Sequence, residues 1–213
     1  TKLHDELSAT AETYSLDLPG FGANPRPKHT LAVEEHAAVL VQALQDAGVS
    51  RCILVGHSMG AQIVAAAALQ APELAAGVVL IGPVVDRRRR NVLRQSLALA
   101  LDSLRESPSA NRIVFTDYLR TGIRWYVSEL KPMMNYRLEE SLRSIPAPVL
   151  VLRGSRDPVA REAWCRELAD AAPAGRFKEI EGHPHVVQHS APAAVADPIR
   201  ALALSIGTRA GAS

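Results

Sequence analysis

The stretch Arg51–Gly60, RCILVGHSMG, sets a G-x-S-x-G pattern between two apolar runs of different kinds. The run before the pattern is short, as in a buried strand. The run after it, Ala61–Ala71, has only two polar residues, which is typical of a helix buried on nearly every side. A strand, a tight turn and a helix in this order place a serine at the tip of a strained turn. We therefore predict that Ser58 lies on such a turn, with Gly56 and Gly60 giving room where strand and helix approach.

Ser58 at the start of a helix has two interpretations. A helix N-cap is a frequent place for serine, but an N-cap needs neither flanking glycine. A nucleophile on a strand-to-helix turn uses both glycines, and the turn aims the positive end of the helix at the reacting atoms. The second interpretation is therefore favoured, with the backbone N–H of Met59 as a donor to a developing oxyanion.

Apolar segments alternate with helical patterns along the rest of the chain. Leu31–Ala47 and Val159–Ala172 repeat apolar residues at helical spacing. A last helical pattern follows Pro192, and because Pro198 interrupts it we expect a kink there or a fresh helix start at Asp197. The alternation predicts an α/β fold, a mostly parallel open sheet with helices on both faces. The strand candidates are Thr13–Leu18, Cys52–Val55, Val78–Ile81, Val149–Leu152 and Phe177–Ile180.

The segment 86–144 breaks this alternation, because it is rich in helical patterns and holds five of the chain's nine aromatic residues. We interpret it as a helical cap inserted into an α/β core made of residues 1–85 and 145–213. The residues assigned to a substrate pocket are His57, Trp125, Tyr126 and Met133. The alternative is that the aromatic residues and methionines of the insertion form a small core of its own.

A serine nucleophile needs a base, and the base needs an orienting carboxylate. Asp157 lies in SRDP, which follows the strand candidate PVLVLRG, so it is placed just past the carboxyl end of a strand, where open α/β sheets gather functional groups. Its alternative interpretation is a turn aspartate before proline. Asp86, after the third predicted strand, is a second candidate acid. The base comes from the segment Glu179–Pro192, EIEGHPHVVQHSAP, whose histidines are His183, His185 and His189.

Three stretches in this order resemble the α/β-hydrolase fold family, in its branch of small cap-bearing esterases and related hydrolases. YSLDLPGFGANP is similar to the family's strand and loop D-x-P-G-x-G-x-S, RCILVGHSMG to its nucleophile elbow, and VLVLRGSRDPV to its acid strand. The family's histidine pattern, I-x-G-x-x-H-x-x-x-x-x-x-P, is matched at every fixed position by the segment Ile180–Pro192. The resemblance therefore implies a triad of Ser58, Asp157 and His185, with His183, two residues earlier, as the alternative base.

The resemblance also implies two or three strands and an HG loop ahead of the first matching stretch, and that loop supplies the family's second oxyanion donor. In the family, one of these strands lies between the strands that Thr13–Leu18 and Cys52–Val55 resemble. We therefore expect an α/β-hydrolase-like sheet that is incomplete at its N-terminal side. Either residues upstream of Thr1 provide the remaining strands, which we favour, or the two strands pair directly in a rearranged sheet.

The composition of the chain indicates which classes of partner to expect. The 24 lysines and arginines nearly balance the 22 aspartates and glutamates, which leaves no basic footprint for nucleic acid. No apolar run reaches the roughly 18 residues that a membrane span needs. We therefore expect a cytoplasmic protein whose partner is a small acyl compound, with no nucleic-acid or membrane partner.

Together these features predict a serine hydrolase of small carboxylic esters or related acyl compounds. It would work through an acyl-enzyme and need no metal or organic cofactor. The same triad also serves C–C bond hydrolysis, peracid formation or acyl transfer, because fold and triad do not set the substrate. A hypothesis from another class is a ligand-binding or sensor module of the same fold with little turnover.

Overall fold

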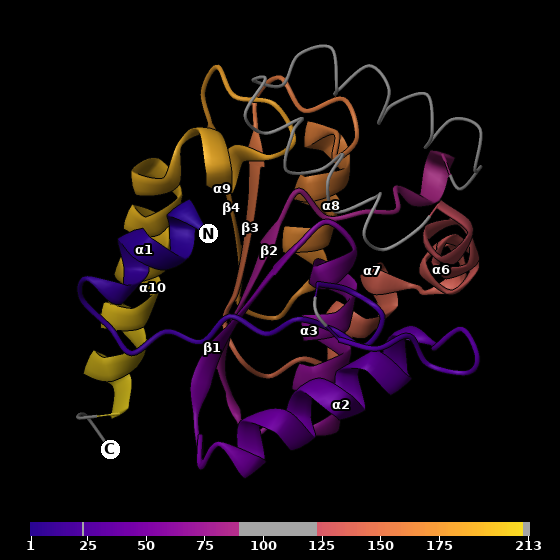
Figure 1. Ribbon diagram of the computed structural model, residues 1–213. Coiled ribbons are helices and arrows are strands. Elements are labelled where there is room, and N and C mark those ends of the chain that lie inside the picture. The colour runs from indigo at the N-terminus through magenta and orange to yellow at the C-terminus, as the bar shows by residue number, and fades with distance from the viewer. Residues whose placement is uncertain (23, 90–122, 211–213) are drawn as a thin grey trace.

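A computed structural model describes residues 1–22, 24–89 and 123–210 of the chain. Four parallel strands form one sheet in the order β1-β2-β3-β4, with helices on both of its faces (Figure 1). The predicted α/β fold is therefore confirmed. The strands are β1 (Cys52–His57), β2 (Ala75–Ile81), β3 (Val149–Gly154) and β4 (Gly175–Ile180).

The two faces of the sheet have separate hydrophobic cores, because successive side chains of a strand point to opposite faces. In β2, Val78 and Leu80 pack with one set of helices, and Val79 and Ile81 pack with the other. The first set is α2 (Val33–Asp46), α3 (Met59–Gln70) and α8 (Glu162–Ala171). The second set is α1 (Lys2–Ser8), α9 (Val187–Ser190) and α10 (Pro192–Ala210).

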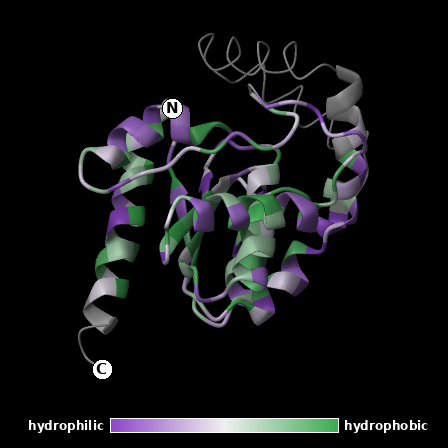
Figure 2. Ribbon diagram, turned by 60° about the horizontal axis from the view of Figure 1, so that its bottom comes forward, coloured by the Kyte–Doolittle hydropathy of each residue, from purple (hydrophilic) through white to green (hydrophobic). Residues whose placement is uncertain are grey.

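Helix α3 is the central helix that the sequence predicts. Every residue from Ala61 to Ala68 is buried, and five of these eight are alanine, so this helix packs closely against β1, β2 and α2. Hydrophobic residues gather in the middle of the molecule, whereas the N-terminal helix is largely hydrophilic (Figure 2). This packing holds the N-terminus of α3 directly after the carboxyl end of β1.

The strand predicted at Thr13–Leu18 is wrong, because this segment forms neither helix nor strand. A strand requires a ladder of hydrogen bonds to a neighbour, and the side chains of Tyr14 and Leu16 are 48% and 43% exposed instead of lying on a sheet. The alternative in which this segment pairs with β1 is therefore wrong as well. β1 is an edge strand of the sheet, and Val55 on it is 36% exposed.

Of the two expectations at Pro198, the fresh helix start is wrong and the kink stays a prediction. Helix α10 runs from Pro192 to Ala210 without a break, so no fresh helix begins at Asp197. A proline inside a helix leaves the carbonyl four residues earlier without its N–H partner. That residue is Ala194, which is exposed, so water can hydrogen-bond to its carbonyl.

The predicted cap, 86–144, lies partly outside the described residues, since 90–122 are not among them. Its described parts are helical, as expected. They are η1 (Arg87–Arg89), α6 (Ile123–Asn135), α7 (Leu138–Ser141) and η2 (Leu142–Ser144). Across residues 1–22, 24–89 and 123–210, none of the helices combines the length and the apolar content that crossing a bilayer requires.

Candidate active site

Ser58 lies on a strained turn between β1 and α3. Its φ of 56° and ψ of −117° are rare for a residue with a side chain, and its N–H donates to the carbonyl of Ile81 at 2.9 Å. A Cβ added to Gly56 would lie 2.2 Å from the carbonyl oxygen of Gly60. The end of the strand and the start of the helix therefore meet at a distance that only glycine permits at position 56.

Gly60 differs from the expectation that both glycines make room for this approach. A Cβ added to Gly60 would meet nothing within 4 Å among the described residues. A side chain at position 60 would therefore have room, and Gly60 contributes its backbone carbonyl to the contact with Gly56. The expected need for a small residue therefore holds for Gly56 and is wrong for Gly60.

Met59, the expected oxyanion donor, is the first residue of α3. The first N–H groups of a helix have no acceptor four residues earlier within the helix, and they carry its positive dipole end. The backbone N–H of Met59 is thus positioned next to Ser58 at a helix start. The side chain of Met59 packs on a cluster made of Val84, Val85, Met133, Met134 and Val159, beside Leu130.

Asp157 and His185 are brought together in a buried pair. The Nδ1–H of His185 donates to Oδ2 of Asp157 at 2.8 Å, and both side chains are almost fully buried. The other carboxylate oxygen accepts the backbone N–H groups of Val159 at 2.7 Å and Ala160 at 3.0 Å. Burial alone would raise the pKa of Asp157, but the charge and hydrogen bond of His185 and these N–H groups together hold that pKa below its usual range.

Two contacts bring Ser58 to the same place as this pair. The ring of His57, next to Ser58 in the chain, lies 4.7 Å from the ring of His185 between centroids. The carbonyl that accepts from Ser58 belongs to Ile81, and a Cβ added to the next residue, Gly82, would lie 3.0 Å from the His185 ring. Ser58 is therefore close to the buried His185 by two routes. Its chain neighbour His57 contacts the His185 ring, and its hydrogen-bond partner Ile81 directly precedes Gly82, which lies against that ring.

His57, which the sequence assigns to the substrate pocket, is half-buried and bonded to the base segment. Its Nε2–H donates to the backbone carbonyl of His185 at 3.1 Å. Burial and the neighbouring charge of His185 lower the pKa of His57 to about 3. His57 is therefore neutral at physiological pH, and it adds no second positive charge beside His185.

The alternative base and the alternative acid point elsewhere. Nδ1 of His183 contacts Oγ of Ser190 at 3.0 Å. Asp86 is buried in an ion pair with Arg161, and it also accepts the N–H of Arg88 at 2.9 Å. Among the described contacts, Asp157 is therefore the aspartate that hydrogen-bonds to His185, whereas Asp86 forms an ion pair with Arg161.

The remaining pocket residues lie on helix α6. Met133 is buried in the apolar cluster beside Met59, and its carbonyl accepts the Nε2–H of Gln62 in α3 at 3.0 Å. Trp125 and Tyr126 also belong to α6, but their side chains lie outside the described part of the structure. The structure thus places one of the three next to the turn that carries Ser58.

Comparison with known proteins agrees with this geometry. Residues 1–197 match the model of the alpha/beta hydrolase family. The chain belongs to this family. Over 68 residues it is 44% identical to the uncharacterized hydrolase YugF of Bacillus subtilis, an alignment that covers 32% of this chain and 25% of that protein. The chain spans about a quarter of the length of the curated relatives that it matches.

Solved esterases share the fold at low sequence identity. A thermophilic esterase from Thermogutta terrifontis aligns with a TM-score of 0.81 and 20% identity, over 96% of this chain and 84% of that one. The esterase RhEst1 from Rhodococcus sp. ECU1013 aligns with a TM-score of 0.71 and 19% identity, over 97% and 85%. Family and fold together support a hydrolase.

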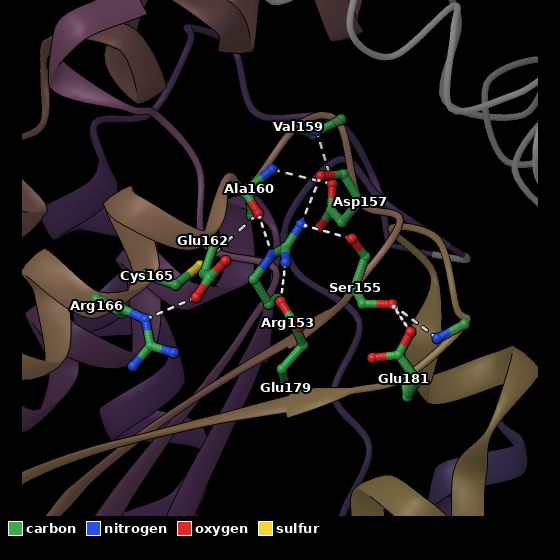
Figure 3. Close-up of polar contacts among 11 residues, drawn as sticks. Arg153, Ser155, Asp157, Val159, Ala160, Glu162, Cys165, Arg166, Glu179 and Glu181 are labelled. Atoms are coloured by element: carbon green, nitrogen blue, oxygen red, sulfur yellow. Dashed lines mark hydrogen bonds and ion pairs between the residues drawn. The ribbon is translucent and has the colours of Figure 1, made fainter.

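Two residues around the Asp157–His185 pair are missed by the sequence-based interpretation. Gly82 follows β2 with a φ of 53°, and its missing side chain leaves room for the His185 ring. Arg153 in β3 is buried beneath the loop that carries Asp157 (Figure 3). A single arginine in an otherwise apolar strand, PVLVLRG, is a signal that could have drawn attention to the second residue.

Proposed function

We propose that the protein is a serine hydrolase that cleaves small carboxylic esters or related acyl compounds through an acyl-enzyme. The observation that carries the proposal is the convergence of the Ser58 turn with the buried His185–Asp157 pair, through the contacts of His57 and Ile81. The family and the esterase fold of its solved neighbours support the same reaction class.

In the proposed reaction, Oγ of Ser58 attacks the carbonyl carbon of the substrate while Nε2 of His185 takes the hydroxyl proton. Asp157 keeps the proton of His185 on Nδ1, so that Nε2 can accept, and its negative charge stabilises the imidazolium. The N–H of Met59 donates to the developing oxyanion. The imidazolium then protonates the leaving alkoxide, and an acyl group stays on Ser58.

Water completes the proposed cycle. His185 removes a proton from the water as it attacks the acyl carbon, and it returns that proton to Oγ of Ser58 when the carboxylic acid leaves. Neutral His57 favours both half-reactions, because a second cation against the His185 ring would oppose the imidazolium that forms in each. The scheme uses no metal and no organic cofactor.

The partner that we propose is a small acyl compound, not a nucleic acid or a membrane. Its support is the near balance of 24 basic and 22 acidic residues together with a site built for acyl transfer. The buried apolar cluster of Val84, Val85, Met133, Met134 and Val159 beside Met59 suits an uncharged substrate better than an ionic one. A cytoplasmic location stays a prediction.

Labelling by a fluorophosphonate tests the nucleophile. We expect covalent labelling of Ser58 in the wild-type protein and none in Ser58→Ala, while Ser8→Ala, at an exposed serine of α1, labels like the wild type. Mass spectrometry of the labelled peptide locates the adduct. A wild-type protein that stays unlabelled, or that labels equally after Ser58→Ala, would contradict the proposal.

A series of p-nitrophenyl esters of increasing chain length tests the substrate class. Hydrolysis with a burst of nitrophenol is expected for short chains, since an acyl-enzyme accumulates when its hydrolysis is slow. Saturable binding of acids or lactones in a thermal-shift measurement, without product release from any ester, would instead support the sensor hypothesis.

A further inference from the structure

We infer that Arg153 is a positioning residue, which holds the loop of residues 155–160 so that Asp157 faces His185. This inference rests on the proposed function for its kinetic consequences. Residues 155–160, called the acid loop below, connect β3 to the segment before α8 and carry Asp157 near their middle. Nothing in the triad itself explains how a loop without regular structure holds a carboxylate in one orientation.

The Arg153 side chain is 6% exposed and reaches under the acid loop (Figure 3). Its Nε–H donates to the carbonyl of Ala160 at 2.7 Å, and Nη2 donates to the carbonyls of Asp157 at 3.0 Å and Ser155 at 3.3 Å. One guanidinium thus bonds to the first residue, the middle and the last residue of the loop.

A buried arginine needs an opposite charge, and the sheet supplies one. Arg153 and Glu179 are paired in the parallel register of β3 and β4, and Nη1 of Arg153 forms an ion pair with Glu179. The pair neutralises the guanidinium and fixes the direction of its plane, so the remaining donors face the loop.

The loop in turn fixes the carboxylate. Ala160 accepts from Arg153 through its carbonyl and donates through its N–H to Oδ1 of Asp157. The N–H of Val159 bonds to the same oxygen. Because Oδ1 is held by two N–H groups, Oδ2 is left to accept from His185. The order of contacts runs from Glu179 through Arg153 and the loop backbone to the Asp157–His185 pair.

Lysine cannot reproduce this arrangement. A guanidinium presents five N–H groups in a rigid planar fork, whereas an ammonium is a compact point charge on a flexible stem. Arg153→Lys keeps the positive charge beside Glu179 but loses the simultaneous bonds to three carbonyls. This variant therefore separates the fork geometry from the charge.

The test compares Arg153→Lys with a double variant, Arg153→Met with Glu179→Met. Arg153 is buried and Glu179 is half-buried, so replacing both with apolar residues of similar volume avoids the unpaired charge that a single replacement leaves, and we expect the double variant to fold if the single one does not. The matched control is Arg166→Lys on α8, whose side chain is exposed and pairs with Glu162 within the helix. Thermal unfolding checks that each variant is folded.

The first readout needs no turnover. The Nδ1–H proton of His185, held by Asp157, gives a downfield resonance in proton NMR spectra, assigned by its loss in His185→Gln. We expect the resonance in the wild type and in Arg166→Lys, and its loss or broadening in folded Arg153→Lys and in the double variant. A resonance that is unchanged in both of these variants would overturn the inference.

The second readout is the pH profile of ester hydrolysis. A displaced Asp157 lowers kcat by on the order of 10- to 100-fold with KM nearly unchanged, because a misplaced group costs this much in the transition state. A displaced carboxylate also stabilises the imidazolium of His185 less, so the acid limb of kcat/KM moves to lower pH. A purely structural role for Arg153 would reduce the folded fraction without moving that limb.

The two readouts also distinguish a failure of this inference from a failure of the proposed function. If the wild type shows the resonance but hydrolyses no ester, the proposed function fails and the NMR comparison still decides the role of Arg153.

Discussion

The turn that carries Ser58, here called the nucleophile turn after its proposed role, and the Asp157–His185 pair, the proposed acid–base half of the site, are built in different ways. The turn is set by the backbone: Gly56 lies against the carbonyl of Gly60, and Ser58 takes a positive φ with its N–H bonded across to β2. The acid–base half is set by side chains, since Asp157 and His185 belong to two loops joined by their own hydrogen bond. A local pattern can therefore specify the first half, whereas the second depends on contacts between distant segments.

This difference predicts how each half fails. A change in the turn should disturb packing and stability together with activity, because strand, turn and helix share one backbone contact. A change in the acid–base half should disturb activity with little effect on the fold, because each side chain there makes contacts that an isosteric residue can partly keep.

The largest expected effect is on the acid. Asp157→Asn presents an amide to Nδ1 of His185, which turns the ring to the tautomer that cannot accept the proton of Ser58. We expect kcat for ester hydrolysis to fall by on the order of 10⁴-fold, with little change in the melting temperature. Steady-state kinetics of the purified variant measures this change.

The control for this prediction is Asp86→Asn, at the other buried aspartate after a strand. Asp86 pairs with Arg161 and not with a histidine, so its replacement should affect stability and leave kcat at the wild-type value. A similar loss of kcat in both variants would mean that Asp157 has no special place in the reaction.

The next largest effect concerns the two glycines of the turn. Gly56→Ala puts a methyl group against the Gly60 carbonyl, where backbone and not a flexible side chain must move, and should reduce the free energy of unfolding by about 3 kcal/mol. Gly60→Ala meets no atom within 4 Å among the described residues and gains helix propensity, so it should be stabilising by up to about 1 kcal/mol. Urea unfolding of the two variants compares them directly. Equal destabilisation by the two substitutions would show that position 60, like position 56, has no room for a side chain.

Much of the fold was predictable because three of its strands, β1, β2 and β3, hold continuous apolar runs. Four of the five predicted strands are present, and they form the parallel sheet. Thr13–Leu18 alternates apolar and polar residues as a strand can, but it forms no strand, because pairing requires a neighbour that a local pattern cannot specify. The fresh helix start at Asp197 was wrong for a related reason, since the cost of a proline inside a helix depends on whether the carbonyl four residues earlier, here that of Ala194, is open to water.

The candidate site was predictable to the extent that order along the chain reflects contact in space. Ser58 follows from its flanking residues, while Asp157 and His185 follow from their place after strands and from the resemblance. Arg153 and Gly82 did not follow, because their meaning lies in partners far along the chain: the acid loop and Glu179 for one, the His185 ring for the other.

The smallest of these effects tests the contact that joins the two halves. The pKa of His57 is lowered to about 3 in the folded protein, whereas an unfolded histidine titrates near 6.5. Between these values the unfolded chain binds a proton that the folded chain does not, so stability falls as the pH falls from about 6.5 towards 3.

His57→Gln removes this dependence while keeping an amide donor for the His185 carbonyl. We expect the variant to lose less stability than the wild type on acidification, by at most about 2 kcal/mol at pH 5, in urea unfolding at a series of pH values. Parallel curves for the two proteins would show that His57 titrates alike in both states, and that the nucleophile turn and the base segment are not joined by a neutral His57 ring.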